Sequence, residues 1–204
     1  MKIIGITGGV GAGKTEVLSL IKRNCKCKIV LADELANSLK EPGQSCYEKV
    51  VELLGTTVLD PDGTINKKRM AERIFRKDAH ALLEQVNQII HPMVRQEILA
   101  LIQEETERKC VDYFFIEAAL LLEDGYREIC DEIWFIKTDR TIREKRLIES
   151  RGYSKEKIMQ IMEKQFDDQT FEQLCDEVIN NSEDLIHTEH QIKLLIQKKQ
   201  AENS

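Results

Sequence analysis

The sequence predicts a doubly wound α/β fold built on a mainly parallel sheet of five strands. Short apolar runs, suited to strands buried on both faces, recur along the chain and are separated by segments with helical spacing. In such folds, ligands bind beyond the carboxyl ends of the strands, so the functional residues are expected there. The expected strands are Lys2–Thr7, Lys28–Ala32, Tyr113–Glu117, Glu132–Lys137 and Glu177–Asn180.

The length of 204 residues suits one compact domain with an insertion. No good strand pattern occurs between Glu34 and Asp112, and the spacing of Leu82, Val86 and Ile90 there is helical. We therefore expect a single domain with a helical substrate-binding insertion and a small lid. The expected parts are a core of residues 1–33, 112–138 and 170–204, an insertion of about 34–111, and a lid of about 139–169.

Composition narrows the class of partner and the compartment. The net charge is −6, and 30 Lys and Arg are interleaved with 36 Asp and Glu, so nucleic acid is not an expected partner. No apolar stretch reaches about 18 residues and no signal-peptide pattern opens the chain, so we expect a cytoplasmic protein without a membrane partner. The six cysteines include no CxxC pair and are expected to be reduced thiols. A monomer or a weak homo-oligomer is expected.

A glycine-rich loop at Gly8–Thr15 carries the strongest functional signal. It has the form GxxxxGK[ST], directly after the first expected strand and before a helical segment that opens at Glu16. Glycines let the backbone N–H groups turn toward phosphate oxygens, and the helix N-terminus adds a favourable dipole. The motif chemistry predicts binding of a nucleoside triphosphate by Gly9, Val10, Gly11, Ala12, Gly13, Lys14, Thr15 and Glu16, with Lys14 on the β- and γ-phosphates and Thr15 on Mg²⁺.

Two carboxylates at expected strand ends could serve phosphoryl transfer. Asp33 follows the second strand and Glu117 ends the third. A kinase needs one carboxylate to orient or deprotonate the attacking hydroxyl, and a carboxylate can hold Mg²⁺ through water. The alternative for Asp33 is a helix N-cap, and the alternative for Glu117 is a solvent-facing strand-end acid. We expect Asp33 to be catalytic, and either of the two carboxylates to assist the metal.

The segment Asp60–Gly63 fits two descriptions. It has turn-forming residues, and it also matches the DxxG pattern of GTPase switches. A GTPase would need this motif directly after a strand and an NKxD motif later, whereas Asn66–Arg69 lacks the aspartate. We therefore predict a turn.

Landmarks spread along most of the chain resemble the dephospho-coenzyme A kinase family. Ile6–Thr15 is similar to the family's LTGGIGSGKS, and Leu31–Ala36 followed by Glu41–Gly43 is similar to its DAD-x-(I/L)-A region. Further similarities are Ile90–Val94 to L-HP-x-(V/I), Glu117–Glu123 to D-x-PLLFE, Arg146 with Arg151–Ser154 to R-x4-R-x3-(S/T), Gln165 to a family Gln, and Cys175–Asn181 to AD-x-VI-x-N.

This resemblance implies transfer of the ATP γ-phosphoryl group to the ribose 3′-hydroxyl of dephospho-coenzyme A, which gives coenzyme A and ADP. It implies that Asp33 orients or deprotonates that hydroxyl and that His91 and Arg95, with Glu117, help to bind the substrate. It also implies a lid that carries Arg143, Arg146 and Arg151, of which Arg146 and Arg151 are the expected catalytic cations, and it places Asn180 near the adenine. The simpler alternatives are that His91 before Pro92 ends a helix, and that the arginines form a solvated helix face.

The chain departs from the family pattern at several positions. Glu117 stands for the usual aspartate, Ala119 for proline, Glu16 for a small hydroxyl residue and Cys175 for alanine, and the family often carries Gln at position 143. Two further functions therefore stay open at this point. One is a kinase of the same fold class that acts on another nucleotide or small metabolite, and the other is a non-catalytic ATP-binding regulatory module.

Overall fold

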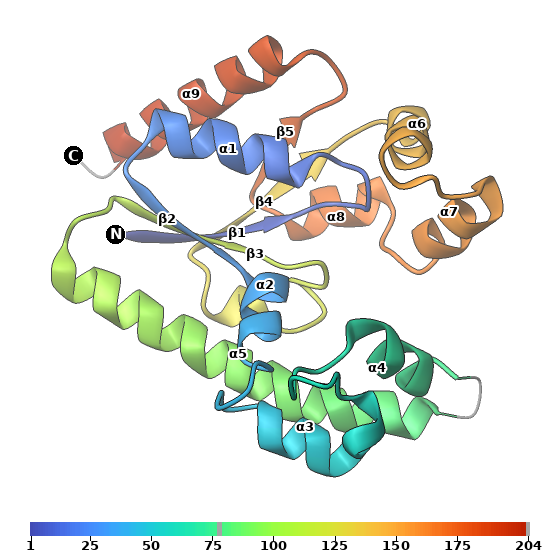
Figure 1. Ribbon diagram of the computed structural model, residues 1–204. Coiled ribbons are helices and arrows are strands. Elements are labelled where there is room, and N and C mark those ends of the chain that lie inside the picture. The colour runs from blue at the N-terminus through green and yellow to red at the C-terminus, as the bar shows by residue number, and fades with distance from the viewer. Residues whose placement is uncertain (77–78, 203–204) are drawn as a thin grey trace. The chain divides into compact units, whose positions relative to one another are not determined.

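A computed structural model of the chain describes residues 1–76 and 79–202. Positions 77–78 of the expected insertion and 203–204 of the expected core lie outside this range. Within the described residues, five strands form one sheet in the order β2-β3-β1-β4-β5 (Figure 1). The predicted α/β fold class is confirmed.

The strands begin and end almost where the apolar runs do. The pairs β1 with β3, β1 with β4, and β4 with β5 are all parallel. The one boundary that differs is that of the second strand, which was expected over Lys28–Ala32 and begins and ends one residue earlier. The observed strands are β1 (Lys2–Thr7), β2 (Cys27–Leu31), β3 (Tyr113–Glu117), β4 (Glu132–Lys137) and β5 (Glu177–Asn180).

The chain divides into two compact units. The first comprises Met1–Val30 and Arg108–Ser204, and the second comprises Leu31–Glu107. In the first unit, α1 (Lys14–Asn24) and α9 (Leu185–Glu202) lie side by side over one face of the sheet (Figure 1). The core of this unit contains Phe114, Phe115, Trp134 and Phe135, each at most 1% exposed. The remaining helical elements of the unit are η2 (Tyr126–Glu128), α6 (Arg140–Arg151), α7 (Lys155–Met162) and α8 (Asp168–Leu174).

The second unit contains helices and a turn. Its long helix α5 (His80–Arg108) continues through Pro92, so the alternative in which His91 ends a helix is wrong. Pro92 lies on the exposed side of the helix, where a missing N–H costs little buried hydrogen bonding. The predicted turn at Asp60–Gly63 is confirmed by a hydrogen bond from the Gly63 N–H to the Asp60 carbonyl, 2.9 Å long. The other elements are α2 (Ala32–Ser38), α3 (Tyr47–Leu54), η1 (Thr56–Val58) and α4 (Lys67–Ile74).

A nearly buried ion cluster joins α9 to the amino ends of β4 and β5. Lys199, whose side chain is 7% exposed, lies 2.9 Å from Glu132 Oε1 and 3.0 Å from Glu177 Oε1. Burial alone would lower the pKa of Lys199, but its hydrogen bonds to both glutamates raise that pKa overall. Burial likewise opposes ionisation of Glu132, but hydrogen bonds from Lys2, Trp134 and Lys199 lower the pKa of this carboxyl. The cluster therefore stabilises the fold in its ionised form.

Replacing Lys199 with Met should lower the free energy of unfolding at pH 7 by about 2 kcal/mol, because two partly buried carboxylates lose the partner that they share and keep Lys2 and Lys198. The pKa values of Glu132 and Glu177 are lowered in the folded protein, so the cluster contributes above the unfolded value of about 4.3 and is lost as pH falls through the folded values. The difference between variant and wild type in urea titrations should therefore shrink below about pH 4.

The matched control is Lys193→Met on the same helix. Lys193 is 52% exposed and pairs with Glu189 at 3.2 Å, so its loss should cost less than about 1 kcal/mol. Equal losses from the two variants would contradict a special role for the cluster.

Candidate phosphate-binding site

The loop between β1 and α1, called the P-loop below (residues 8–15), has the backbone that the sequence predicts. Gly13 is the N-cap of α1, with φ of 81°, and it has no side chain to cap the first N–H groups of the helix. A Cβ atom at Gly13 would come 2.5 Å from Nδ2 of Asn181, so both the backbone angle and the available space require glycine. Uncapped N–H groups at a helix N-terminus form an anion site.

Three side chains hold the P-loop through the carbonyl oxygen of Ala12. This oxygen accepts hydrogen bonds from Thr138 Oγ1 at 2.9 Å, Asn181 Nδ2 at 2.8 Å and Arg146 Nη1 at 3.4 Å. Thr138 and Asn181 follow the carboxyl ends of β4 and β5, and each is 1% exposed. Two strands and one helix thus fix the orientation of the peptide at Ala12.

Lys14 and Glu117, both predicted site residues, are neighbours. The Lys14 Nζ atom donates a hydrogen bond to the Gly8 carbonyl at 2.9 Å and lies 3.6 Å from Glu117 Oε1. Both side chains are about 15% exposed, so the pair is partly shielded from water. Thr15 and Glu16, in the first turn of α1, are exposed. The structure therefore brings the lysine, the strand-end carboxylate and the start of α1 together.

The arginines of α6 differ in their surroundings. Arg146 donates to Ala12 and, through Nη2, to the Asn181 carbonyl at 3.2 Å, so it braces the P-loop. Arg143 is 9% exposed and lies against Gly9. Arg151 is exposed, with its guanidinium 5.9 Å from the centre of the Tyr153 ring. The three arginines therefore do not form one solvated face, because two of them contact the P-loop.

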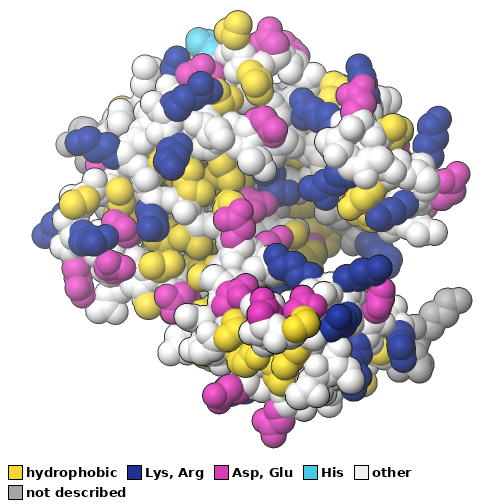
Figure 2. Space-filling model, viewed as in Figure 1, with side chains coloured by type: hydrophobic (Ala, Val, Ile, Leu, Met, Phe, Trp, Pro, Cys, Tyr) yellow, Lys and Arg dark blue, Asp and Glu magenta, His cyan; other side chains and the backbone are white. Residues whose placement is uncertain are grey.

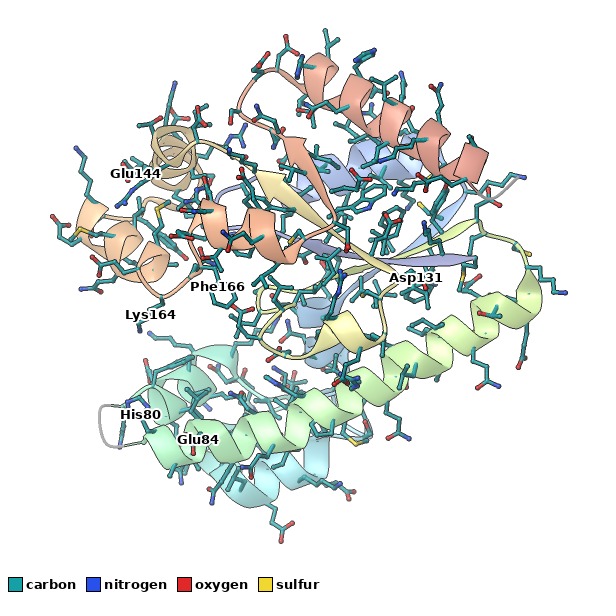
Figure 3. All side chains as sticks on the ribbon, turned by 180° about the vertical axis from the view of Figure 1, so that it is seen from behind. His80, Glu84, Asp131, Glu144, Lys164 and Phe166 are labelled. Atoms are coloured by element: carbon teal, nitrogen blue, oxygen red, sulfur yellow. The ribbon has the colours of Figure 1, made fainter. Side chains whose placement is uncertain are left out.

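A side chain from the connection between α7 and α8 reaches the P-loop. Gln165 Oε1 accepts a hydrogen bond from the Val10 N–H at 2.9 Å. Gln165 stands between Lys164 and Phe166, which Figure 3 labels at the end of α7 and beside α8. Phe166 packs edge-on against Phe171 of α8, which fixes this connection close to the sheet. Gln165 entered the sequence analysis only as a family landmark, because a single glutamine carries no spacing signal.

Asn180 and Asn181 have different roles. The Asn180 side chain accepts the Ser182 N–H at 3.0 Å, and its backbone pairs with Gln191, so it shapes the turn after β5. Asn181 is buried against Ala12 and also accepts a hydrogen bond from Thr188 Oγ1 at 3.0 Å. The predicted place of Asn180 near the adenine stays a prediction, and the contact of Asn181 with the P-loop was not predicted. No spacing or motif in the sequence marks Asn181 as the partner of a residue 169 positions away.

Three predicted residues belong to the second unit. Asp33 is exposed and lies in the first turn of α2, not at the end of a strand. The N-cap of α2 is Leu31, so the N-cap alternative for Asp33 is wrong. His91 and Arg95 lie one turn apart on α5, on the same side of the helix. The predicted site residues thus include members of each compact unit.

The residues of the P-loop suit a phosphate chain and its magnesium ion. Two hydrogen-bond donors of the loop already bind oxygen atoms of the protein. The Val10 N–H donates to Gln165 Oε1, and Lys14 Nζ donates to the Gly8 carbonyl. The exposed Thr15 hydroxyl and the Glu117 carboxylate are oxygen donors of the kind that Mg²⁺ prefers. Within the described residues, no group of three or more His, Cys, Asp or Glu could hold a metal ion. A metal here would therefore depend on phosphate oxygens and water as well.

Charges of both signs are mixed on one face of the molecule. On the face that Figure 2 shows, Lys and Arg side chains lie among Asp and Glu. In the part of the chain that the structure describes, no helix combines the length and the apolar character needed to cross a membrane.

Asn181→Ala should raise the dissociation constant of Mg-ATP about tenfold and lower the free energy of unfolding by about 2 kcal/mol, because a buried hydrogen bond to the loop is lost. Asn24→Ala is the matched control, because the Asn24 amide donates to Leu20 and Glu189 at the other end of α1, and it should leave ATP affinity within about twofold. Isothermal titration and urea unfolding measure the two effects. An equal loss of ATP affinity in Asn24→Ala would contradict the role of Asn181.

Comparisons with known proteins agree with this geometry. The dephospho-CoA kinase family model matches residues 2–187. A dephospho-CoA kinase of Dehalococcoides mccartyi is 35% identical over 89% of this chain and 89% of its own length, and one of Streptococcus mutans is 30% identical over 98% and 99%. A solved dephospho-CoA kinase from Campylobacter jejuni, 22% identical and covering 100% of both chains, shares the fold with a TM-score of 0.73. The chain belongs to the dephospho-CoA kinase family.

Proposed function

We propose that this chain transfers the γ-phosphoryl group of ATP to the ribose 3′-hydroxyl of dephospho-CoA, giving CoA and ADP in the last step of CoA synthesis in the cytoplasm. The observation that carries the proposal is the P-loop with its uncapped helix N-terminus, its partly buried Lys14 and its fixed Ala12 peptide. The names of the curated relatives support the choice of acceptor. The alternative of a non-catalytic module has no separate observation in its favour.

The first unit supplies the nucleotide site in this proposal. The N–H groups at the start of α1 bind phosphate oxygens, and Lys14 moves from the Gly8 carbonyl to the β- and γ-phosphates. Thr15 and Glu117 would hold Mg²⁺ through their oxygen atoms. When bound, the ion neutralises charge on the phosphates and orients the terminal one.

The lid of about residues 139–169 adds cations in this proposal. Arg146 keeps the P-loop in place and Arg151 approaches the transferred group when the lid closes. Asn180 forms the turn beside which the adenine binds.

The second unit, residues 31–107, binds the acceptor in this proposal. The 3′-hydroxyl oxygen attacks the γ-phosphorus of ATP, and its proton passes to a carboxylate oxygen of Asp33. The bond from that phosphorus to the oxygen that bridges it to ADP breaks. His91 and Arg95, one helical turn apart, bind the anionic part of the acceptor. The exposed position of Asp33 in the first turn of α2 leaves its carboxylate available to a substrate.

Asp33→Asn should reduce phosphoryl transfer at least about 100-fold, because the proton acceptor is lost, while Mg-ATP affinity changes less than about twofold. Glu34→Gln is the control, since Glu34 is the next exposed acid of the same helix turn. Coupled detection of ADP with dephospho-CoA as acceptor measures transfer, and titration measures binding.

A panel of other nucleotides and metabolites completes this test. Transfer to another acceptor with none to dephospho-CoA would overturn the choice of acceptor. Unchanged transfer in Asp33→Asn would overturn the role of Asp33, and ATP binding without transfer to any acceptor would favour the regulatory module.

A further inference from the structure

Arg143 carries a buried positive charge that forms no ion pair among the residues that the structure describes. It is 9% exposed, and within the same residues its buried Nε atom has no hydrogen-bond partner. The ion pairs of α6 join Arg140 to Glu144 and Lys145 to Glu149, and neither includes Arg143. Glu144, its neighbour in the sequence, lies on the outer part of α6 in Figure 3 and pairs with Arg140 at 2.9 Å.

The guanidinium group lies directly against the P-loop. A Cβ atom on Gly9 would overlap Nη1 of Arg143, and the same point is 3.5 Å from Gln165 Oε1. That oxygen is already bound to the Val10 N–H. A Cβ atom on Gly11 would come 3.0 Å from the Arg143 carbonyl, so the backbone of α6 is also packed against the loop. Arg143 therefore lies next to the first residues of the P-loop.

Burying a charged group away from water costs free energy. An arginine cannot avoid this cost by losing its proton, because the guanidinium group stays charged in proteins. A buried cation without a counter-charge destabilises the fold, and a buried polar atom without a partner in a natural protein calls for a functional explanation or a missing ion. The adjacent loop is one whose N–H groups attract anions. An anion bound at the P-loop would supply both the counter-charge and the missing acceptors.

We infer that Arg143 is a specificity-determining residue that binds the terminal phosphate of a nucleoside triphosphate and so favours ATP over ADP. This inference rests on the proposed function and deepens it. The backbone N–H groups at the start of α1, after Gly13, bind the inner phosphates, and the Lys14 side chain reaches the β- and γ-phosphates from there. Gly9 and Val10 form the opposite end of the loop, so a cation placed there meets the outer end of the phosphate chain.

The key experiment compares Arg143→Met with Lys145→Met. Both variants remove one positive charge from α6, but the Lys145 side chain is 74% exposed. Mg-ATP and Mg-ADP are titrated separately without any acceptor, at constant ionic strength. Arg143→Met should weaken ATP binding about tenfold or more and ADP binding less than about threefold, because a charge-assisted contact to the terminal phosphate is lost. Lys145→Met should leave both affinities within about twofold.

Thermal unfolding of the same variants separates this role from a structural one. Removing an unbalanced buried charge should raise the Tm of the nucleotide-free protein by about 2–4 °C in Arg143→Met, and reduce the further rise that ATP produces. Arg143→Lys keeps the charge without the planar fork, so it should retain part of the preference for ATP.

The inference fails if Arg143→Met keeps the wild-type ratio of ATP to ADP affinity, or if both affinities fall equally. If Arg143→Met does not fold, the ratio is read from Arg143→Lys, and an unchanged ratio there also overturns it. Wild-type protein that binds no ATP would instead contradict the proposed function. The two failures are therefore distinguishable.

Discussion

The geometry of the P-loop depends on the three donors that hold the carbonyl oxygen of Ala12. A phosphate-binding loop must turn successive N–H groups inward, so its carbonyl groups point outward and need partners of their own. Thr138, Asn181 and Arg146 supply them at Ala12. Because these residues come from the ends of β4 and β5 and from α6, the order of strands around β1 determines whether the loop can hold an anion.

This dependence explains which parts of the site the sequence could predict. The backbone of the P-loop follows from local chemistry, since Gly13 needs a positive φ and Lys14 begins a helix. The positions of the strands could be predicted equally well, because a buried parallel strand appears in the sequence as a continuous apolar run. Partners that approach from distant segments leave no such local trace. Asn181, 169 positions after Ala12, contacts it only because β5 ends beside β4 in the sheet.

The boundaries that differ from the sequence predictions also depend on more than local sequence. Asp33 was expected to end a strand, but helix α2 already begins at Ala32, so its carboxylate belongs to a helix turn. A helix end was possible before Pro92, but α5 continues because the ring lies on an exposed side of a long helix. In both cases the local sequence preference did not determine where the helix begins or ends.

The two ends of the sheet in the first unit illustrate opposite uses of buried charge. At the amino ends of β4 and β5, Lys199 is matched by Glu132 and Glu177, and each group lies in a favourable ion pair. At the carboxyl ends, Arg143 is buried beside the P-loop with an unpartnered Nε. A balanced charge stabilises the protein by itself, whereas an unbalanced one becomes favourable only with a ligand of opposite sign. The stability that the first cluster provides can therefore offset the cost of keeping a cation ready at the second.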